Sequence, residues 1–291
     1  MAENPVILFN KASFDCSKIV TTAYSTSFSS AISLLHPDLR NPIHGIYGFV
    51  RLADEIVDSF HHQDKAELLN AFEDETYAAI TRGLSVNPII HSFQATVRKY
   101  NIDEQLVADF LYSMKMDLHK SVYDDVQDFN KYIHGSAEVV GLMCLYVFCE
   151  GDKEKYLELK PAASALGAAF QKVNFLRDLK ADYETLERSY FPEFNFNDFD
   201  QITKSSIEKS IEADFKASYV GILKLPLKAR FGVYVAYKYY TALFKKIQQM
   251  KPEHILQNRV RIPNYTKACL LITPNSQVKK QKSLRYAHGV H

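Results

Sequence analysis

Two segments of the chain carry acidic, basic and amide side chains at helical spacing between apolar neighbours. Residues 46–58 include Tyr47, Arg51, Asp54 and Asp58, which fall at positions i, i+4, i+7 and i+11. These intervals place the four side chains on one face of an α-helix. Carboxylates one turn apart, at about 6 Å and an effective dielectric near ~20, repel each other by roughly 3 kcal/mol. We therefore predict that a cation lies against this face.

The same pattern recurs in residues 170–182, on Gln171, Asn174, Asp178 and Asp182. Either motif alone is typical of a solvated helix face. Together, with Arg51 and Arg177 beside them and apolar flanks, they favour two facing helices that hold Mg²⁺ and a diphosphate. Mg²⁺ takes oxygen ligands, commonly one or two carboxylates with waters and substrate phosphates. An arginine can donate two parallel hydrogen bonds to phosphate oxygens.

The elements that must position these stripes are predicted to be helices. The 291 residues are 47% hydrophobic but include only 10 Gly and 10 Pro, too few turn formers for an all-β fold. We expect an all-α, single-domain fold over residues 1–291, with a core at about 12–273 and a polar tail at 274–291. Periodicity and capping residues predict helices at about 14–34, 41–58, 64–82, 87–100, 103–119, 128–149, 161–186, 203–223 and 226–250.

Charge and cysteine usage exclude several classes of protein. The net charge of +1 does not indicate nucleic-acid binding. The longest apolar run, residues 139–149, is shorter than the ~20 residues of a membrane span, and the N-terminus lacks the basic segment of a signal peptide. The four cysteines show no metal-binding or redox spacing. We therefore expect a cytoplasmic protein whose basic tail, residues 274–291, is solvated or else weakly attracted to anionic lipid.

Three segments taken together resemble the squalene/phytoene synthase family, most closely its bacterial phytoene synthases, from about Tyr24 to Lys267. The first retains Ser27, Phe28, Leu35, Arg40, Tyr47, Arg51, Asp54 and Asp58. The second retains Gly167, Gln171, Asn174, Arg177, Asp178, Asp182, Arg188, Tyr190 and Pro192. A segment between them keeps Tyr132, Ala137 and Gly141. Ordered motifs over this length are highly specific.

The resemblance implies an isoprenoid-synthase-type helical bundle with a central apolar cavity and prenyltransferase activity. It implies Mg²⁺, with Mn²⁺ as an alternative, held by Asp54, Asp58, Asn174, Asp178 and Asp182. The implied catalytic residues are Asp54, Asp58, Asp178, Asp182, Arg51 and Tyr132, the last as a proton relay. The implied substrate-binding residues are Ser27, Phe28, Tyr47, Arg51, Gln171, Asn174, Arg177, Arg188, Tyr190, Arg259 and Arg261, with Lys267 as a further phosphate contact.

The substrates implied by the resemblance are two geranylgeranyl diphosphates, joined head to head through a cyclopropylcarbinyl diphosphate to give phytoene. One alternative is squalene or dehydrosqualene synthesis from two farnesyl diphosphates, with NADPH needed only for squalene. Another is a non-catalytic relative that acts as an assembly or binding protein. Peripheral contact with the membrane is expected because the product is oily, and the sequence predicts no oligomeric state.

The chain departs from the family pattern at Glu55, where phytoene synthases often carry Asp, and at Glu138 and Glu187, where the family often has a small residue. Glu55 remains a carboxylate. We expect Glu138 to crowd or recharge the middle of its helix and Glu187 to stiffen the loop after the second acidic motif. Both put the substrate preference and the rate in question.

Overall fold

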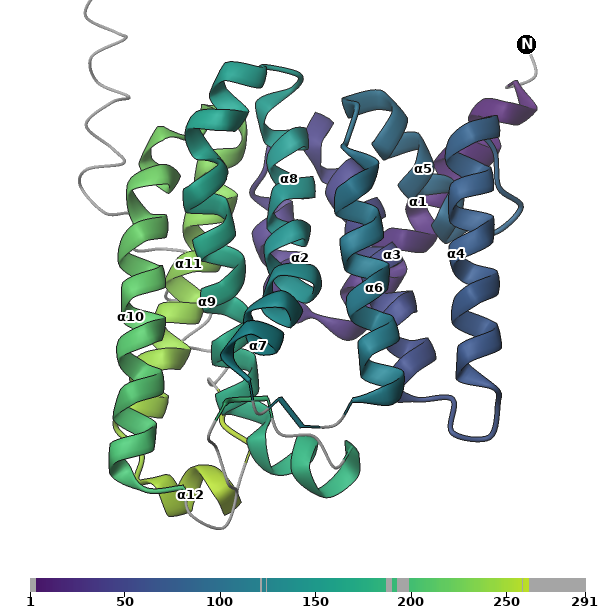
Figure 1. Ribbon diagram of the computed structural model, residues 1–291. Helices are drawn as coiled ribbons and strands as arrows, with labels where there is room; N and C mark the ends of the chain where they lie inside the picture. The colour runs from purple at the N-terminus through teal and green to yellow at the C-terminus, as the bar shows by residue number, and fades with distance from the viewer. Residues whose placement is uncertain are drawn as a thin grey trace, which may run out of the picture.

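The computed structural model describes residues 4–120, 122–123, 125–186, 190–192, 199–257 and 259–261, without the side chains of residues 185 and 186. Within these ranges the regular structure is helical and includes no β-strand, so the predicted all-α class is confirmed (Figure 1). The helices are α1 (Pro5–Tyr24), α2 (Thr26–Ser33), α3 (Pro37–Asp58), α4 (Lys65–Arg82), α5 (Pro88–Tyr100), α6 (Glu104–His119), α7 (Val126–Ile133), the π-helical turn η1 (His134–Glu138), α8 (Val139–Cys149), α9 (Lys153–Leu186), α10 (Gln201–Lys224), α11 (Leu227–Gln248) and α12 (Pro252–Gln257).

Helices with clear capping residues begin and end where the sequence predicts. Asp64 accepts a hydrogen bond from the backbone N–H of Glu67 at the start of α4, and Asn87 and Asp103 cap α5 and α6 in the same way. Gly83 ends α4 with φ of 78°, a left-handed conformation that glycine adopts at little cost. Local side-chain chemistry therefore determines these boundaries.

The first two predicted helices differ from the structure at their ends. The segment predicted as one helix is divided at Ser25, whose extended backbone (φ −144°) ends α1 and whose side chain accepts a hydrogen bond from the N–H of Phe28 at 3.2 Å. The next helix begins at Pro37 instead of residue 41, because His36 caps it and a proline fits the first turn. Pro42 consequently lies inside α3 instead of in its first turn.

The middle of the chain also differs from the prediction. The helix expected from Asp128 begins at Val126 with Asp125 as its cap, and it is interrupted by η1 before α8. The helix expected from residue 161 begins at Lys153, so Pro161 lies within α9.

The continuous helical stretch Val126–Cys149, of 24 residues, is by length and composition long enough to cross a membrane, although the apolar run alone is not. Its most apolar window is 56% buried inside the bundle, as expected of a core helix.

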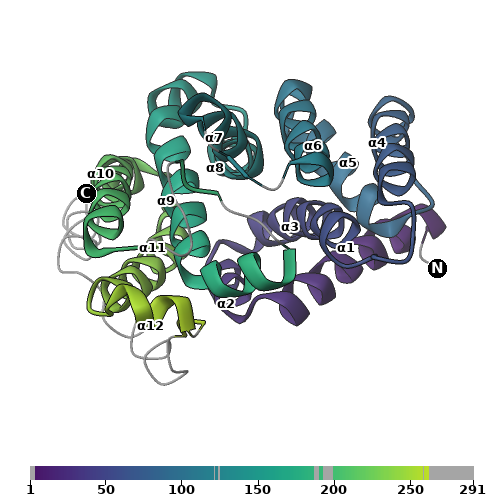
Figure 2. The same cartoon turned by 60° about the horizontal axis from the view of Figure 1, so that its bottom comes forward.

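The helices pack into two groups that meet along the middle of the bundle. α3 packs against α1, α5 and α8, and Phe49 at its centre stacks on Phe93 with ring centroids 3.8 Å apart. α9 packs against α10, α8, α11 and η1. Viewed from the bottom of the bundle (Figure 2), α3 and α9 lie on either side of its middle, with α2 and α8 between them. The two predicted polar stripes are carried by these two helices.

Candidate functional site

A cavity of about 470 Å³ lies between the two groups of helices. One part of its wall is polar and includes Arg51 and Asp54 from α3, Gln171, Asn174 and Arg177 from α9, and Arg259. The rest is largely apolar, with Ile32, Leu35, Leu145, Phe148, Leu159 and Leu225 among its residues. An amphiphile with a charged head and a hydrocarbon chain is complementary to such a wall.

Arg51 is the centre of the polar wall on α3. Its guanidinium pairs with Glu55, and its Nη1 lies 3.8 Å from Oδ2 of Asp54. The guanidinium carbon lies 4.3 Å from the centre of the Tyr24 ring, a cation–π contact that orients the side chain. Its Nε is buried without a hydrogen-bond partner in the structure. Arg51 therefore has a free donor close to the cavity that it lines.

Arg177 and Asp178 form the charged centre on α9. Nε of Arg177 donates to both carboxylate oxygens of Asp178 at 3.0 Å. Burial acts to lower the pKa of Arg177, but the hydrogen bond and negative charge of Asp178 outweigh it and raise the pKa above its usual value. One turn earlier, Nδ2 of Asn174 donates to Oε1 of Gln171 at 3.4 Å.

Charged residues from both polar stripes affect the pKa of one hydroxyl group, that of Tyr47. Burial raises the pKa of Tyr47, and the charges of Arg51 and Asp54 from α3 and of Arg177 from α9 all act on it. Ser25 forms a hydrogen bond with the same hydroxyl, which lowers the pKa. Tyr47 itself lines the cavity. Residues of both α3 and α9 therefore line the same cavity.

The segment after α12 closes one side of the polar wall. Nε of Arg259 lies 2.7 Å from Oδ1 of Asp178, and the N–H of Val260 donates to the carbonyl of Arg177 at 3.4 Å. Arg261 is exposed, and its carbonyl accepts a hydrogen bond from Lys246 at 2.7 Å. Of the two predicted arginines, only Arg259 lines the cavity.

Aromatic rings line the junction between the polar and apolar walls. Phe28 lies 5.9 Å from Tyr47 and 5.8 Å from Tyr240, measured between ring centroids. Tyr240 stacks on Phe170 at 3.9 Å and donates a hydrogen bond to Oδ1 of Asn174 at 3.2 Å. Burial raises the pKa of Tyr240 to about 12, so its hydroxyl stays protonated and remains a donor.

The residues of this wall that sequence reasoning did not identify include Tyr24, Ser25 and Tyr240. Tyr24 and Ser25 lie where the first predicted helix is divided, which periodicity did not show. Tyr240 belongs to the tyrosine-rich stretch of α11. Only its spacing on the buried face of that helix could have indicated it.

Several predicted residues lie away from the described cavity wall. Tyr132 is buried, stacks on Tyr190 at 5.4 Å and donates a hydrogen bond to Oδ2 of Asp117 at 2.9 Å. Tyr190 stacks on Phe175 at 3.9 Å. Ser27, Asp58, Asp178 and Asp182 are partly buried and are not part of the wall, although Asp178 contacts two arginines that are. Glu187, Arg188 and Lys267 lie outside the described residues.

The predicted metal ligands have the donor atoms of a Mg²⁺ site. All five offer oxygen atoms, which suits a hard divalent cation. Within the described ranges, no group of three or more His, Cys, Asp or Glu side chains is close enough together to hold a metal ion. Instead, Arg51 and Arg177 pair with the carboxylates. The donor chemistry therefore fits Mg²⁺, while the arrangement shown has arginines beside the acidic stripes.

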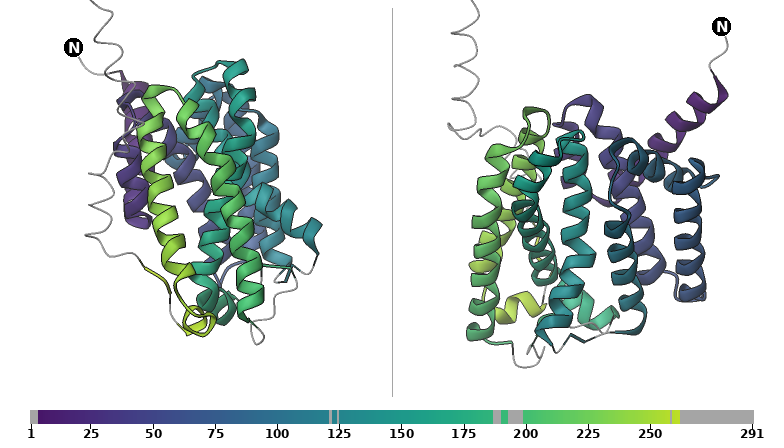
Figure 3. Two further views of the ribbon diagram at one scale, coloured as in Figure 1. Left: turned by 90° about the vertical axis from the view of Figure 1, so that its left-hand side faces the viewer. Right: turned by 45° about the horizontal axis from the view of Figure 1, so that its top comes forward.

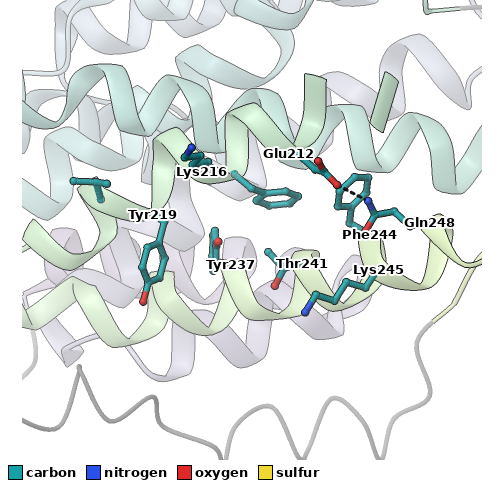
Figure 4. A pocket seen from close by; sticks show the side chains of 10 residues that line it. Glu212, Lys216, Tyr219, Tyr237, Thr241, Phe244, Lys245 and Gln248 are labelled. Atoms are coloured by element: carbon teal, nitrogen blue, oxygen red, sulfur yellow. Dashed lines mark hydrogen bonds between the residues drawn. The ribbon is translucent and has the colours of Figure 1, made fainter. Parts of the chain in front are cut away.

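A second hollow, also of about 470 Å³, lies between α10 and α11 (Figure 4). Its floor includes Phe215 and Phe244, and Gln248 donates a hydrogen bond to Glu212 at 2.7 Å across one end. None of the predicted site residues lines it. The chemistry expected from the sequence therefore belongs to the first cavity.

The chain belongs to the squalene/phytoene synthase family, whose model matches residues 21–266. It is thus an enzyme of the prenyltransferase type. The chain is 24% identical to the phytoene synthase of Arthrospira platensis over 92% of its own length and 93% of that protein. It is 31% identical to chloroplastic phytoene synthase 1 of Arabidopsis thaliana, but over 60% of this chain and 42% of that protein. It is 26% identical to the 4,4'-diapophytoene synthase of Staphylococcus haemolyticus over 66% of each chain.

Solved structures show the same fold. A crystal structure of a dehydrosqualene synthase in complex with a ligand superposes with a TM-score of 0.80, at 21% identity, over 94% of this chain and 98% of that chain. The squalene synthase HpnC of Alicyclobacillus acidocaldarius gives a TM-score of 0.73 at 21% identity, over 84% of this chain and 96% of that chain. At these identities the likeness shows the fold, and the substrate must be argued from the site.

Proposed function

We propose that this enzyme is a phytoene synthase, which joins two geranylgeranyl diphosphates head to head in carotenoid synthesis. The observation that carries this proposal is the single cavity whose wall is charged on one side and apolar on the rest. The phytoene synthases among its relatives, and the length over which the Arthrospira protein matches, favour this substrate pair over others in the family.

In this proposal the three arginines of the polar wall, Arg51, Arg177 and Arg259, bind the diphosphate oxygens. Asp54, Asp58, Asn174, Asp178 and Asp182 would hold Mg²⁺, which when bound stabilises the negative charge on the diphosphate as it leaves. Asp178 now pairs with two of the arginines. Those guanidinium groups are therefore available for the diphosphate once the carboxylate has a cation of its own.

Loss of diphosphate leaves an allylic cation, which the double bond of the second substrate attacks. A proton is then lost, and a cyclopropylcarbinyl diphosphate forms. A second loss of diphosphate and a rearrangement give a cation joined at its two head carbons, and loss of a further proton from this cation gives phytoene. The faces of Phe28, Phe170 and Tyr240 border the cavity, where they exclude water and stabilise the cation electrostatically. Tyr132, which the resemblance implies as a proton relay, does not line this cavity and donates its hydroxyl hydrogen bond to Asp117, so it is given no step in this proposal.

The experiment that tests this function is a product assay. Purified enzyme with Mg²⁺ is incubated with geranylgeranyl diphosphate or farnesyl diphosphate, with and without NADPH, and the extracted hydrocarbon is identified by mass spectrometry. Phytoene from geranylgeranyl diphosphate without NADPH supports the proposal. A C30 hydrocarbon as the main product overturns it in favour of the second candidate, dehydrosqualene or squalene synthesis, which the dehydrosqualene synthase fold and the diapophytoene synthase relative favour. No product from either substrate favours a non-catalytic relative.

We also propose that the enzyme works in the cytoplasm in contact with the membrane surface. The N-terminal end of α1 projects from the bundle (Figure 3) and exposes Val6, Ile7 and Leu8 by 61%, 56% and 51%. Apolar side chains of this kind insert into a lipid interface. Flotation with liposomes of phosphatidylcholine and phosphatidylglycerol is expected to carry the enzyme upward, and Leu8→Asp to weaken this. Enzyme that stays at the bottom of the gradient contradicts the proposal.

A further inference from the structure

Ser136 lines the cavity from the π-helical turn η1, and its hydroxyl oxygen is buried without a hydrogen-bond partner. Other buried serines on these helices donate to a backbone carbonyl of the preceding turn. Ser113 donates to Phe110 at 2.6 Å, and Ser218, which lines the same cavity, donates to Phe215 at 3.0 Å. A buried hydroxyl without a partner lowers stability. The hydroxyl of Ser136 thus has the capacity to bind a group in the cavity.

The π-helical turn explains why this hydroxyl lacks a local partner. The N–H of Val139 donates to the carbonyl of His134, five residues earlier, instead of the four of an α-helix. The wider turn moves the carbonyls that a helical serine normally reaches. Such turns occur frequently at functional sites. Close packing holds this one in place, since a Cβ at Gly135 would lie 2.6 Å from the carbonyl of Asp109.

Residues on both sides of Ser136 in the chain contact α9. Gly167 packs so closely on Ala137 that a Cβ would lie 2.6 Å from its carbonyl oxygen, and the rings of Tyr132 and Phe175 lie 6.1 Å apart. Ser136 lines the cavity together with Gly167 and with Gln171, where the polar stripe of α9 begins. Ser136 therefore borders a cavity that α9 lines with both small and polar residues.

We propose that the Ser136 hydroxyl donates a hydrogen bond to the ester oxygen of a bound prenyl diphosphate. This inference rests on the proposed function. The ester oxygen is the atom at which the charged head meets the hydrocarbon chain, and Ser136 lines the cavity whose wall has a charged part and an apolar part. Rotation about its one side-chain torsion is the motion that would turn its buried Oγ toward a bound ligand.

The chemical role follows from the bond that breaks. When the carbon–oxygen bond cleaves, its electron pair stays on the ester oxygen, which leaves with the diphosphate. The serine keeps its proton, and its hydrogen bond strengthens as that oxygen becomes negative. An interaction that is stronger in the transition state raises kcat more than it lowers KM.

The experiment compares Ser136→Ala, Ser136→Thr and the control Ser113→Ala. The control removes a buried hydroxyl that contacts the same turn from α6 and is already bonded to Phe110. Ser136→Ala is expected to lower kcat by about 10-fold with KM changed by less than ~2-fold, the range for a lost hydrogen bond to a charged group. Ser136→Thr is expected to restore most of the rate. Ser113→Ala is expected to keep the rate and lower the Tm, whereas Ser136→Ala is expected to raise the Tm slightly, because it loses no hydrogen bond and removes a buried hydroxyl without a partner.

A substrate analogue isolates the atom involved. Geranylgeranyl thiolodiphosphate has sulfur in place of the ester oxygen, and sulfur is a weak acceptor. Wild type and Ser136→Ala are expected to convert it at the same slow rate, because a weak acceptor gains little from the serine hydroxyl. If Ser136→Ala has the kcat of the wild type, or if Ser136→Thr does not restore a lost rate, the hydrogen bond assigned to Ser136 is overturned. The proposed function is not affected by either result. Wild type that turns over neither prenyl diphosphate overturns the function itself, and the assignment with it.

Discussion

Arg259, which lines the cavity, forms an ion pair with Asp178, with Nε of Arg259 2.7 Å from Oδ1 of Asp178. Asp178 belongs to α9, whereas Arg259 follows α12. Arg177 contacts the same carboxylate from the neighbouring position. One acidic residue of the predicted metal cradle is therefore in contact with two arginines, which links the C-terminal part of the chain to the polar stripe of α9.

Replacement of Arg259 is expected to lower activity through the diphosphate. Because a guanidinium donates charge-assisted hydrogen bonds to phosphate oxygens, Arg259→Gln should lower kcat/KM by about 10-fold or more. The matched control is Arg82→Gln, another half-exposed arginine that pairs with a carboxylate, Glu75, on α4. Steady-state kinetics test this. Equal kcat/KM in the two variants would show that Arg259 only closes the structure.

The hydroxyl and the ring of Tyr240 are expected to have separable roles. Tyr240→Phe keeps the stack on Phe170 and loses the hydrogen bond to Asn174, so we expect a loss of activity of about 10-fold or less. Tyr240→Ala also opens the wall and destabilises the fold by about 3–5 kcal/mol. Product assays and thermal melts separate the two effects. A Phe variant as inactive as the Ala variant would show that the hydroxyl, not the ring, is what matters.

The stability of the η1 turn is expected to depend on pH. A hydrogen bond from Nδ1 of His134 to Glu138 at 2.9 Å, opposed by burial and assisted by Asp109, raises the pKa of His134 above 6.5. Since the folded pKa is the higher one, the protonated ring stabilises the fold below about pH 6.5, and this stabilisation is lost as pH rises through the folded pKa. Glu138, which stands where the family often has a small residue, is this hydrogen-bond partner of His134.

The test of the pH response is the difference in Tm between wild type and His134→Gln. The difference should be largest near about pH 6 and shrink towards about pH 8. Taking a difference removes the contributions of His44 and His91, whose pKa values are lowered by burial. His119→Gln, at the exposed end of α6, is the control. A difference that does not vary with pH would rule out this ion pair as the cause.

The contact between η1 and α9 should not tolerate an added methyl group. A Cβ at Gly167 would lie 2.6 Å from the carbonyl oxygen of Ala137, whereas a Cβ at Gly141 would lie 3.0 Å from that of Ala163. Gly167→Ala should therefore cost about 1–3 kcal/mol and Gly141→Ala less. Chemical denaturation measures both. A Gly167→Ala protein as stable as wild type would show that the helices can separate freely there.

The sequence predicted some of the side chains that each helix brings to the cavity, although Asp58, Asp178 and Asp182 of the same stripes do not line it. Arg51 and Asp54, like Asn174 and Arg177, share a face because of helical spacing, and both faces do line the cavity. Pairings between helices were not predictable in this way. The cation–π contact between Tyr24 and Arg51 depends on how α1 packs, and the hydrogen bond from Tyr240 to Asn174 depends on how α11 packs. No single periodic pattern in the sequence encodes this packing.

The fold shows the same division between local and long-range causes. Asp64, Asn87 and Asp103 mark helix starts because capping involves only neighbouring residues. The π-helical turn is not visible in the sequence pattern. It is accompanied by contacts between helices, of Gly135 with α6 and of Gly167 with Ala137, which the pattern along one helix does not show. Local chemistry predicts where helices begin, and packing between helices determines where they deviate.

The central claim is that the stripes of α3 and α9 bind the same diphosphate. Calorimetry with Mg²⁺ and inorganic pyrophosphate tests it on wild type, Arg51→Gln, Arg177→Gln and the remote control Arg82→Gln. We predict that Arg51→Gln and Arg177→Gln each weaken the Kd by about 10-fold or more, while Arg82→Gln binds as wild type does. A loss confined to one of the two helices, or no binding by the wild type, would contradict the claim.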